Sequence, residues 1–156
     1  MGTIKKALFG AGCFWHVEEI FRKMKGVVAV VVGYSGGEMS APTYEKVCSG
    51  ETGHAEVAEV SYDPALVSYD TLVHSFFEMH DPTTADRQGP DVGKQYRSAI
   101  FYATESEKEI AERIKRELDA SGKYAAPIVT EILPVREFYR AEEYHQRYFE
   151  KQKKAH

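Results

Sequence analysis

The chain has 156 residues, which suits one domain with a single hydrophobic core, and we expect one domain over residues 1–156. A net charge of -4 with mixed signs indicates no basic surface for nucleic acid or anionic lipid. No apolar run approaches the roughly 20 residues of a membrane span, and the apolar stretch near the N-terminus is too short for a signal peptide. We therefore expect a cytoplasmic monomer without membrane association.

The hydrophobic pattern predicts strands and helices in alternation along the chain. The predicted strands cover residues 5–12, 27–37, 54–63, 97–104 and 127–135. The predicted helices cover residues 13–26, 64–80, 107–120 and a final amphipathic segment from about residue 137. This order favours an α/β fold (an α+β sandwich) with a mixed sheet flanked by helices, a ferredoxin-like core and long coil loops.

Several local features refine this prediction. The β-branched run over residues 27–37 is typical of a strand covered on both faces, and Ser106 with Glu109 forms a capping-box pattern at the start of the third helix. Residues 35–53 and 81–96 form long irregular segments, and long loops in a compact domain are usually functional. These loops and the glycine turn before residue 13 could meet at one edge of the sheet. The last residues, 150–156, are predicted to be a frayed basic end.

The two cysteines, Cys13 and Cys48, lie too far apart in the chain for a disulfide framework or a zinc pattern. Cys13 follows the sequence GAG and stands where the first helix begins. A helix N-terminus carries a partial positive charge, so a thiolate there is favoured and the pKa of Cys13 should fall. The position therefore indicates a reactive nucleophile, with buried core packing as the alternative.

Two aromatic side chains follow this cysteine. Trp15 is the only tryptophan in the chain, and the apolar stripe of the predicted helix is complete without it. Phe14 and Trp15 could belong to the core, as aromatic residues usually do. They could also form an apolar wall beside the nucleophile, which suits a methyl group or a thioether carbon and not a phosphate.

The sequence GCFW resembles the signature of the peptide methionine sulfoxide reductase A family. The resemblance continues through YSGG, PTYEKVCSGETGHAEVAEVSYDP and HDPTTADRQGPDVGKQYRSAIFY, and it covers the chain from about residue 5 to about residue 150. It implies reduction of the S epimer of methionine sulfoxide, free or in proteins, to methionine through a sulfenic acid on Cys13. Such an enzyme repairs oxidised proteins.

The resemblance also assigns the other site residues. Glu56 matches the family's catalytic acid; strand alternation puts it on the side of Ala58, where burial would raise its pKa, although the pattern alone equally allows a solvated Glu56. Tyr44 and Tyr96 match catalytic positions that hydrogen-bond the sulfoxide oxygen or the acid. Asp91 matches a substrate-binding position. For the implied reaction, Phe14 and Trp15 would supply the apolar slot that binds the S-methyl group of the substrate.

The chain departs from the family pattern at two places. His16 stands where many members have glycine, and we interpret it as a surface residue because a charged histidine there would oppose the helix dipole. The C-terminal segment contains no recycling cysteine, and Cys48 is interpreted as a packed, inert thiol because its neighbour Val47 is apolar. We therefore predict that an external thiol such as thioredoxin reduces the sulfenic acid directly, without an internal disulfide.

Two rival functions stay open. The first is a Cys-His hydrolase or a peroxidase, with His16 or His54 as the base beside Cys13. The second is a non-catalytic module that binds methionine-like side chains through Phe14 and Trp15. Neither rival explains the agreement of so many separate stretches with one reductase family. We expect no metal and no cofactor, since His74 and His80 are too far apart on their helix for a metal pair.

Overall fold

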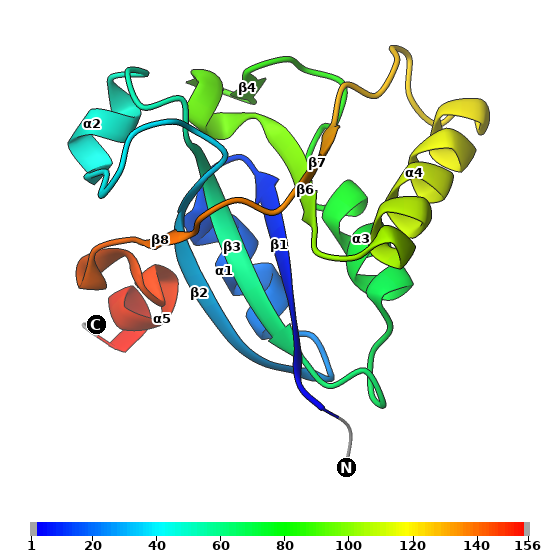
Figure 1. Cartoon of the computed structure of the whole chain (residues 1–156), viewed down its shortest axis with the longest axis horizontal. Coiled ribbons are helices and arrows are strands. Elements are labelled where there is room, and N and C mark those ends of the chain that lie inside the picture. The colour runs from blue at the N-terminus through cyan, green and yellow to red at the C-terminus, as the bar shows by residue number, and fades with distance from the viewer. Residues whose placement is uncertain (1–2, 155–156) are drawn as a thin grey trace.

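The computed structural model of the chain describes residues 3–154, and its centre is a six-stranded sheet (Figure 1). Its strands are β1 (Lys5–Ala11), β2 (Val27–Ser35), β3 (Ala55–Tyr62), β6 (Ser98–Tyr102), β7 (Glu131–Pro134) and β8 (Tyr139–Arg140). The helices are α1 (Phe14–Arg22), α2 (Tyr44–Cys48), α3 (Tyr69–Glu78), α4 (Glu105–Ala120) and α5 (Tyr148–Lys154). A short hairpin, β4 (Arg87–Gln88) and β5 (Asp91–Val92), and two 3-10 turns, η1 (Lys94–Tyr96) and η2 (Glu143–His145), complete the chain.

The strand order β7-β6-β1-β3-β2-β8 contains a ferredoxin-like core. Apart from the insertions that hold α2 and the β4–β5 hairpin with η1, the elements β1, α1, β2, β3, α3 and β6 form a β-α-β-β-α-β unit. Within it, β1 pairs antiparallel with β3 and β6, and β2 pairs antiparallel with β3. The parallel pairing of β7 with β6 makes the whole sheet mixed. The predicted mixed sheet flanked by helices with a ferredoxin-like core is therefore confirmed.

The main core lies between the sheet and the helices behind it in Figure 1. Phe9 of β1 stacks on Phe21 of α1 and on Phe76 of α3, with ring centroids 5.1 and 5.4 Å apart. The opposite face of the sheet is crossed by the connection between β7 and β8, where Phe138 packs near Phe101. Strand alternation thus separates two apolar layers, and it places Glu56 of β3 on the helix face with Ala58, as predicted.

Three local predictions are corrected. The first half of β2 is not covered on both faces: Val28 is 57% exposed, whereas the second half of the strand is buried. The capping box of α4 begins at Thr104, whose hydroxyl accepts from Glu107 N, while Glu107 accepts from Ala103 N. The C-terminal segment divides into β8, η2 and α5, so residues 150–154 are helical, and residues 155–156 lie outside the described part.

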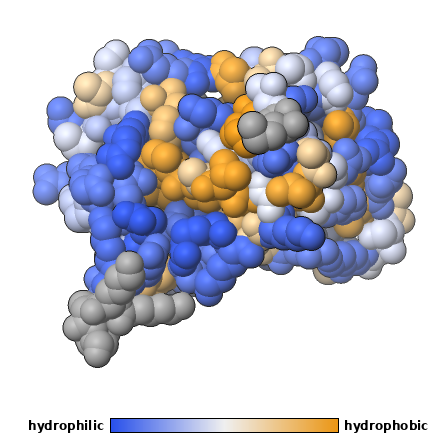
Figure 2. Space-filling view, turned by 90° about the horizontal axis from the view of Figure 1, so that it is seen from below, coloured by the Kyte–Doolittle hydropathy of each residue, from blue (hydrophilic) through white to orange (hydrophobic). Residues whose placement is uncertain are grey.

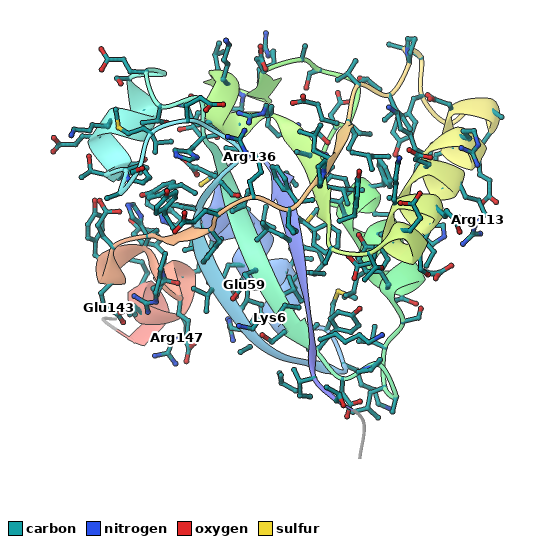
Figure 3. All side chains as sticks on the ribbon, viewed as in Figure 1. Lys6, Glu59, Arg113, Arg136, Glu143 and Arg147 are labelled. Carbon is teal, nitrogen blue, oxygen red and sulfur yellow. The ribbon has the colours of Figure 1, made fainter. Side chains whose placement is uncertain are left out.

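The far end of the sheet is remote from the glycine turn after β1. Seen from below, apolar side chains interrupt a largely hydrophilic surface there (Figure 2). On the sheet, Lys6 of β1 and Glu59 of β3 point toward one another, with Nζ and Oε1 3.6 Å apart (Figure 3). Among residues 3–154, no helix has the length and apolar character needed to cross a membrane.

Candidate active site

The turn between β1 and α1 places Cys13 directly before the first residue of the helix. Cys13 is the N-cap of α1, and its carbonyl accepts from His16 N and Val17 N. Gly12 has a φ of 91°, a left-handed conformation that suits glycine, and a Cβ there would come within 2.8 Å of Gln88 Cγ. The predicted thiol at a helix start is thus confirmed, and the β4–β5 hairpin lies directly against its turn.

The charge state of this thiol differs from the prediction. The pKa of Cys13 is raised to about 11, chiefly by burial and with smaller contributions from Glu56 and Asp91. The backbone N–H groups of Trp15 and His16 lower the pKa, as a helix N-terminus should. This helix effect is outweighed because the thiol is largely withdrawn from water, so the predicted fall of the pKa is wrong for the free protein.

Glu56 lies beside the cysteine at the end of β3 and is 1% exposed. Its Oε1 accepts from Phe14 N at 3.2 Å, which fixes the carboxyl group under the first turn of α1. Its Oε2 is buried with no hydrogen-bond partner among the described residues. Burial raises the pKa of Glu56 to about 8, against the lowering effect of the Phe14 N–H. Of the two environments that the pattern allowed for Glu56, the structure has the buried one.

The two aromatic residues after Cys13 have different environments. Phe14 is 1% exposed, and its ring packs near the rings of Tyr34 and Tyr44. Trp15 is half-buried, and its indole stacks on Tyr148 with ring centroids 3.8 Å apart and planes 6° apart. Phe14 therefore belongs to a local core, while Trp15 presents an apolar surface that solutes can reach.

The two long loops bring Tyr44, Tyr96 and Asp91 to the same edge of the sheet, as expected. Tyr96, on η1, has a pKa raised to about 12 by burial and then by Glu56, Cys48, Asp91 and Cys13. Burial also raises the pKa of Tyr44, on α2, with a further contribution from Glu56. Both phenols therefore stay protonated and lie within electrostatic reach of the acid.

A thiol, a buried carboxyl group with a raised pKa, two phenols and two aromatic side chains thus lie near one another, and similarity to known proteins fits this arrangement. The model of the family described as peptide methionine sulfoxide reductase matches residues 5–156. The chain belongs to this family. A "Peptide methionine sulfoxide reductase MsrA" of Methanosarcina mazei is 61% identical over 148 residues, which cover 95% of this chain and 70% of the relative.

Solved structures of Mxr1 from Saccharomyces cerevisiae resemble this reductase closely. The reduced form has a TM-score of 0.90 and 39% identity, with coverage of 98% of this chain and 88% of Mxr1. Mxr1 in complex with Trx2 has a TM-score of 0.66 and 31% identity, with coverage of 93% and 84%. The fold of this reductase is therefore that of solved family members.

The C-terminal segment supplies site residues that the sequence analysis did not single out. Glu142 accepts from the Tyr34 hydroxyl at 2.8 Å and from Tyr44 N at 2.9 Å. His145 accepts from the Trp15 indole N–H at 2.9 Å. The amphipathic pattern of this segment included His145 and Tyr148, but it gave no indication of which residues they contact.

The histidines proposed as a base for a rival hydrolase lie elsewhere or are already bonded. His54 is buried, with Nδ1 accepting from Gly37 N and Nε2 2.6 Å from the Met39 carbonyl. His16 is exposed and packs against Phe149, so the surface interpretation of His16 is confirmed. Neither ring has a contact with Cys13 among the described residues, so the structure gives the hydrolase no base.

The interpretation of Cys48 as a packed thiol is wrong. Cys48 is exposed, while its neighbour Val47 is the buried residue. Partial desolvation raises the pKa of Cys48, and nearby Glu56 and Glu142 raise it too, although a hydrogen bond with the Tyr44 side chain opposes them. Cys48 is thus accessible to solvent, but its thiolate is disfavoured near neutral pH.

Proposed function

We propose that the chain reduces the S epimer of methionine sulfoxide, free or in proteins, with Cys13 as nucleophile and Glu56 as proton donor. The observation that carries this proposal is Glu56, which is buried, neutral at pH 7 and has one free oxygen beside Cys13. A neutral carboxylic acid can give a proton to a sulfoxide oxygen, which a carboxylate cannot do. Family membership supports the same reaction.

The first step joins the cysteine sulfur to the substrate sulfur. Glu56 Oε2 protonates the sulfoxide oxygen while Cys13 Sγ bonds to the electrophilic sulfur, and the Cys13 proton returns to the Glu56 carboxylate. The hydroxyl group then passes to Sγ as the sulfur–oxygen bond of the substrate and the bond between Sγ and the substrate sulfur both break. Methionine leaves, reduced by two electrons, and Cys13 becomes a sulfenic acid, oxidised by two electrons.

The raised pKa of Cys13 fits this sequence of proton transfers. At neutral pH the free protein carries a proton on both Cys13 and Glu56. When Glu56 gives its proton to the oxygen, the new carboxylate beside the thiol becomes a base within the same site. The thiol is therefore deprotonated as it attacks, and a standing thiolate is unnecessary.

The remaining site residues bind the substrate in this proposal. Trp15, with Phe14 behind it, forms the wall for the S-methyl group. The hydroxyl groups of Tyr44 and Tyr96 hydrogen-bond the sulfoxide oxygen or Glu56, and Asp91 binds the substrate from the β4–β5 hairpin.

An external thiol regenerates the enzyme. The thiol attacks the Cys13 sulfenic acid to give a mixed disulfide and water, and a second thiol releases Cys13 and a disulfide. The Mxr1–Trx2 complex supports a thioredoxin-type reductant. We place this reaction in a reducing compartment such as the cytoplasm, where such thiols are available. The catalytic residues belong to a single domain over residues 1–156.

The test is to mix the protein with dithiothreitol and each sulfoxide epimer and to measure methionine. We expect methionine from the S epimer only. Equal turnover of a peptide ester or a peroxide, with no methionine formed, would favour the hydrolase or peroxidase. Binding of sulfoxide peptides without any methionine release would favour the non-catalytic module.

A further inference from the structure

The indole N–H of Trp15 makes a hydrogen bond that its proposed role in substrate binding does not require. Its Nε1–H donates to Nδ1 of His145, at 2.9 Å, across 130 positions of sequence. An imidazole nitrogen that accepts a hydrogen bond carries no proton, so His145 is neutral with its proton on Nε2. Burial, the larger effect, lowers the pKa of His145, although Glu142 raises it.

The His145 ring is enclosed by aromatic side chains of the site. Its centroid lies 4.1 Å from that of Tyr144, 4.3 Å from that of Tyr44 and 5.1 Å from that of Phe14. The residue is 1% exposed, and Nε2 is buried with no hydrogen-bond partner among the described residues. A buried donor without a partner is unfavourable, so packing alone does not explain a histidine here, whereas the bond to Trp15 does.

The backbone around His145 is fixed on both sides. Gln146 Oε1 accepts from Val32 N at 3.0 Å, and Gln146 Nε2 donates to the carbonyls of Val32 and Ala141 at 2.9 Å each. The Glu142 carboxylate accepts hydrogen bonds from the Tyr34 hydroxyl and from the backbone N–H of Tyr44. His145 therefore occupies a defined place relative to β2 and α2.

The indole is thus held at two points by one segment of the chain. His145 binds its N–H edge, and Tyr148 covers one of its faces. The stacked Tyr148 restricts tilting of the indole, but a ring sliding or turning within its own plane keeps a stacking contact. Among the described residues, the bond to His145 is the hydrogen bond that the indole makes, and its directionality resists such in-plane movement.

We propose that His145 is a positioning residue that sets the indole of Trp15 and thereby limits the space for the alkyl group on the sulfoxide sulfur. The proposal rests on the proposed function, in which Trp15 forms the methyl wall. A fixed wall admits a methyl group and disfavours a larger alkyl group, whereas a wall that moves binds methyl less well and discriminates less.

The test compares two substitutions that differ in the acceptor. In His145→Asn the side-chain oxygen stands near the former Nδ1 and can accept from Trp15. In His145→Phe the ring packing is kept and the acceptor is lost. We expect His145→Phe to raise KM for the methyl sulfoxide about tenfold with kcat changed less than about threefold, and to reduce the preference for methyl over ethyl sulfoxide. His145→Asn should stay within about threefold of the wild type in both measurements.

The matched control is the exposed His74 of α3, where the same two substitutions should change nothing. A KM and an alkyl preference unchanged in His145→Phe would overturn the proposal. So would equal losses in His145→Phe and His145→Asn, because the acceptor would then be irrelevant.

A second measurement needs no substitution and no turnover. Trp15 is the sole tryptophan, so nitrogen-15 NMR of the wild type can detect the coupling between its Nε1 and the Nδ1 of His145 across the hydrogen bond. We expect this coupling, and its absence would overturn the proposal even if His145→Phe fails to fold. If the wild type shows the coupling but releases no methionine from sulfoxide, the proposed function fails instead.

Discussion

Replacing Glu56 by glutamine should make the protein more stable and far less active. The side-chain oxygen of the new glutamine can still accept from Phe14 N, and its amide stands in for the neutral carboxyl group. Because the pKa of Glu56 is raised from 4.5 to about 8, the neutral form is favoured in the folded state. The stabilising effect is complete below pH 4.5 and is lost as the pH rises toward 8.

The size of this effect follows from the two pKa values. At pH 7 Glu56 is ionised in the unfolded chain but neutral in the folded chain. This difference lowers the free energy of unfolding by about 3 kcal/mol relative to a residue that does not ionise. At pH 5 the same cost is only about 1 kcal/mol. The stability of Glu56→Gln relative to the wild type should therefore increase by about 2 kcal/mol between pH 5 and pH 7.

Activity should move in the opposite direction. An amide cannot give up a proton, and loss of a general acid typically lowers a rate by about 10²–10⁴-fold. In the wild type, kcat should fall above pH 8 as Glu56 ionises, to about one tenth of its plateau at pH 9. If a standing Cys13 thiolate were the reactive form, the rate would instead rise toward pH 11.

Urea unfolding at pH 5 and pH 7, together with pH–rate profiles of both proteins, measures these effects. Glu56→Asp is the control: it keeps a carboxylic acid, but on a side chain shorter by one methylene, so it separates loss of the acid from loss of its correct position. A Glu56→Gln protein that keeps the wild-type rate, or whose stability relative to the wild type is the same at both pH values, would refute the role and the environment of Glu56.

Three further predictions concern the thiols and the glycine turn. Cys13→Ser should abolish methionine formation while the fold is kept, and a retained rate would remove Cys13 from the mechanism. After one turnover without reductant, Cys48 should remain alkylatable with no intramolecular bridge to Cys13; loss of both thiols to one disulfide would defeat direct reduction by an external thiol. Gly12→Ala should lower the free energy of unfolding in urea by about 1–2 kcal/mol, because φ is 91° and the added Cβ meets Gln88; an unchanged urea midpoint would contradict the strain.

Local patterns predicted the parts of the site that depend on neighbouring residues. The glycine run and the apolar stripe placed Cys13 at the start of α1, where it is the N-cap, and strand alternation placed Glu56 on the side of Ala58. Resemblance to the family then selected Tyr44, Tyr96 and Asp91 from many similar residues. These residues lie on loops, whose meeting point is set by tertiary contacts that no local pattern encodes.

The errors have the same origin. The pKa of Cys13 depends on how much water the fold removes and on Glu56 and Asp91, which come from other elements, so the helix start alone gave the wrong sign. Cys48 is exposed because the short helix α2 packs inward through Tyr44 and Val47. The hydrogen bond between Trp15 and His145 connects residues 130 positions apart in the sequence, and a periodic pattern cannot reveal such a pair.

The most direct test of the mechanism is a single turnover without reductant. The protein is mixed with excess S-epimer sulfoxide, methionine is counted per chain, and a sulfenic-acid probe is located by mass spectrometry. We predict one methionine per chain and the probe on Cys13. Methionine formed without any label on Cys13, or a label on Cys48 alone, would contradict oxygen transfer to the thiol at the start of α1.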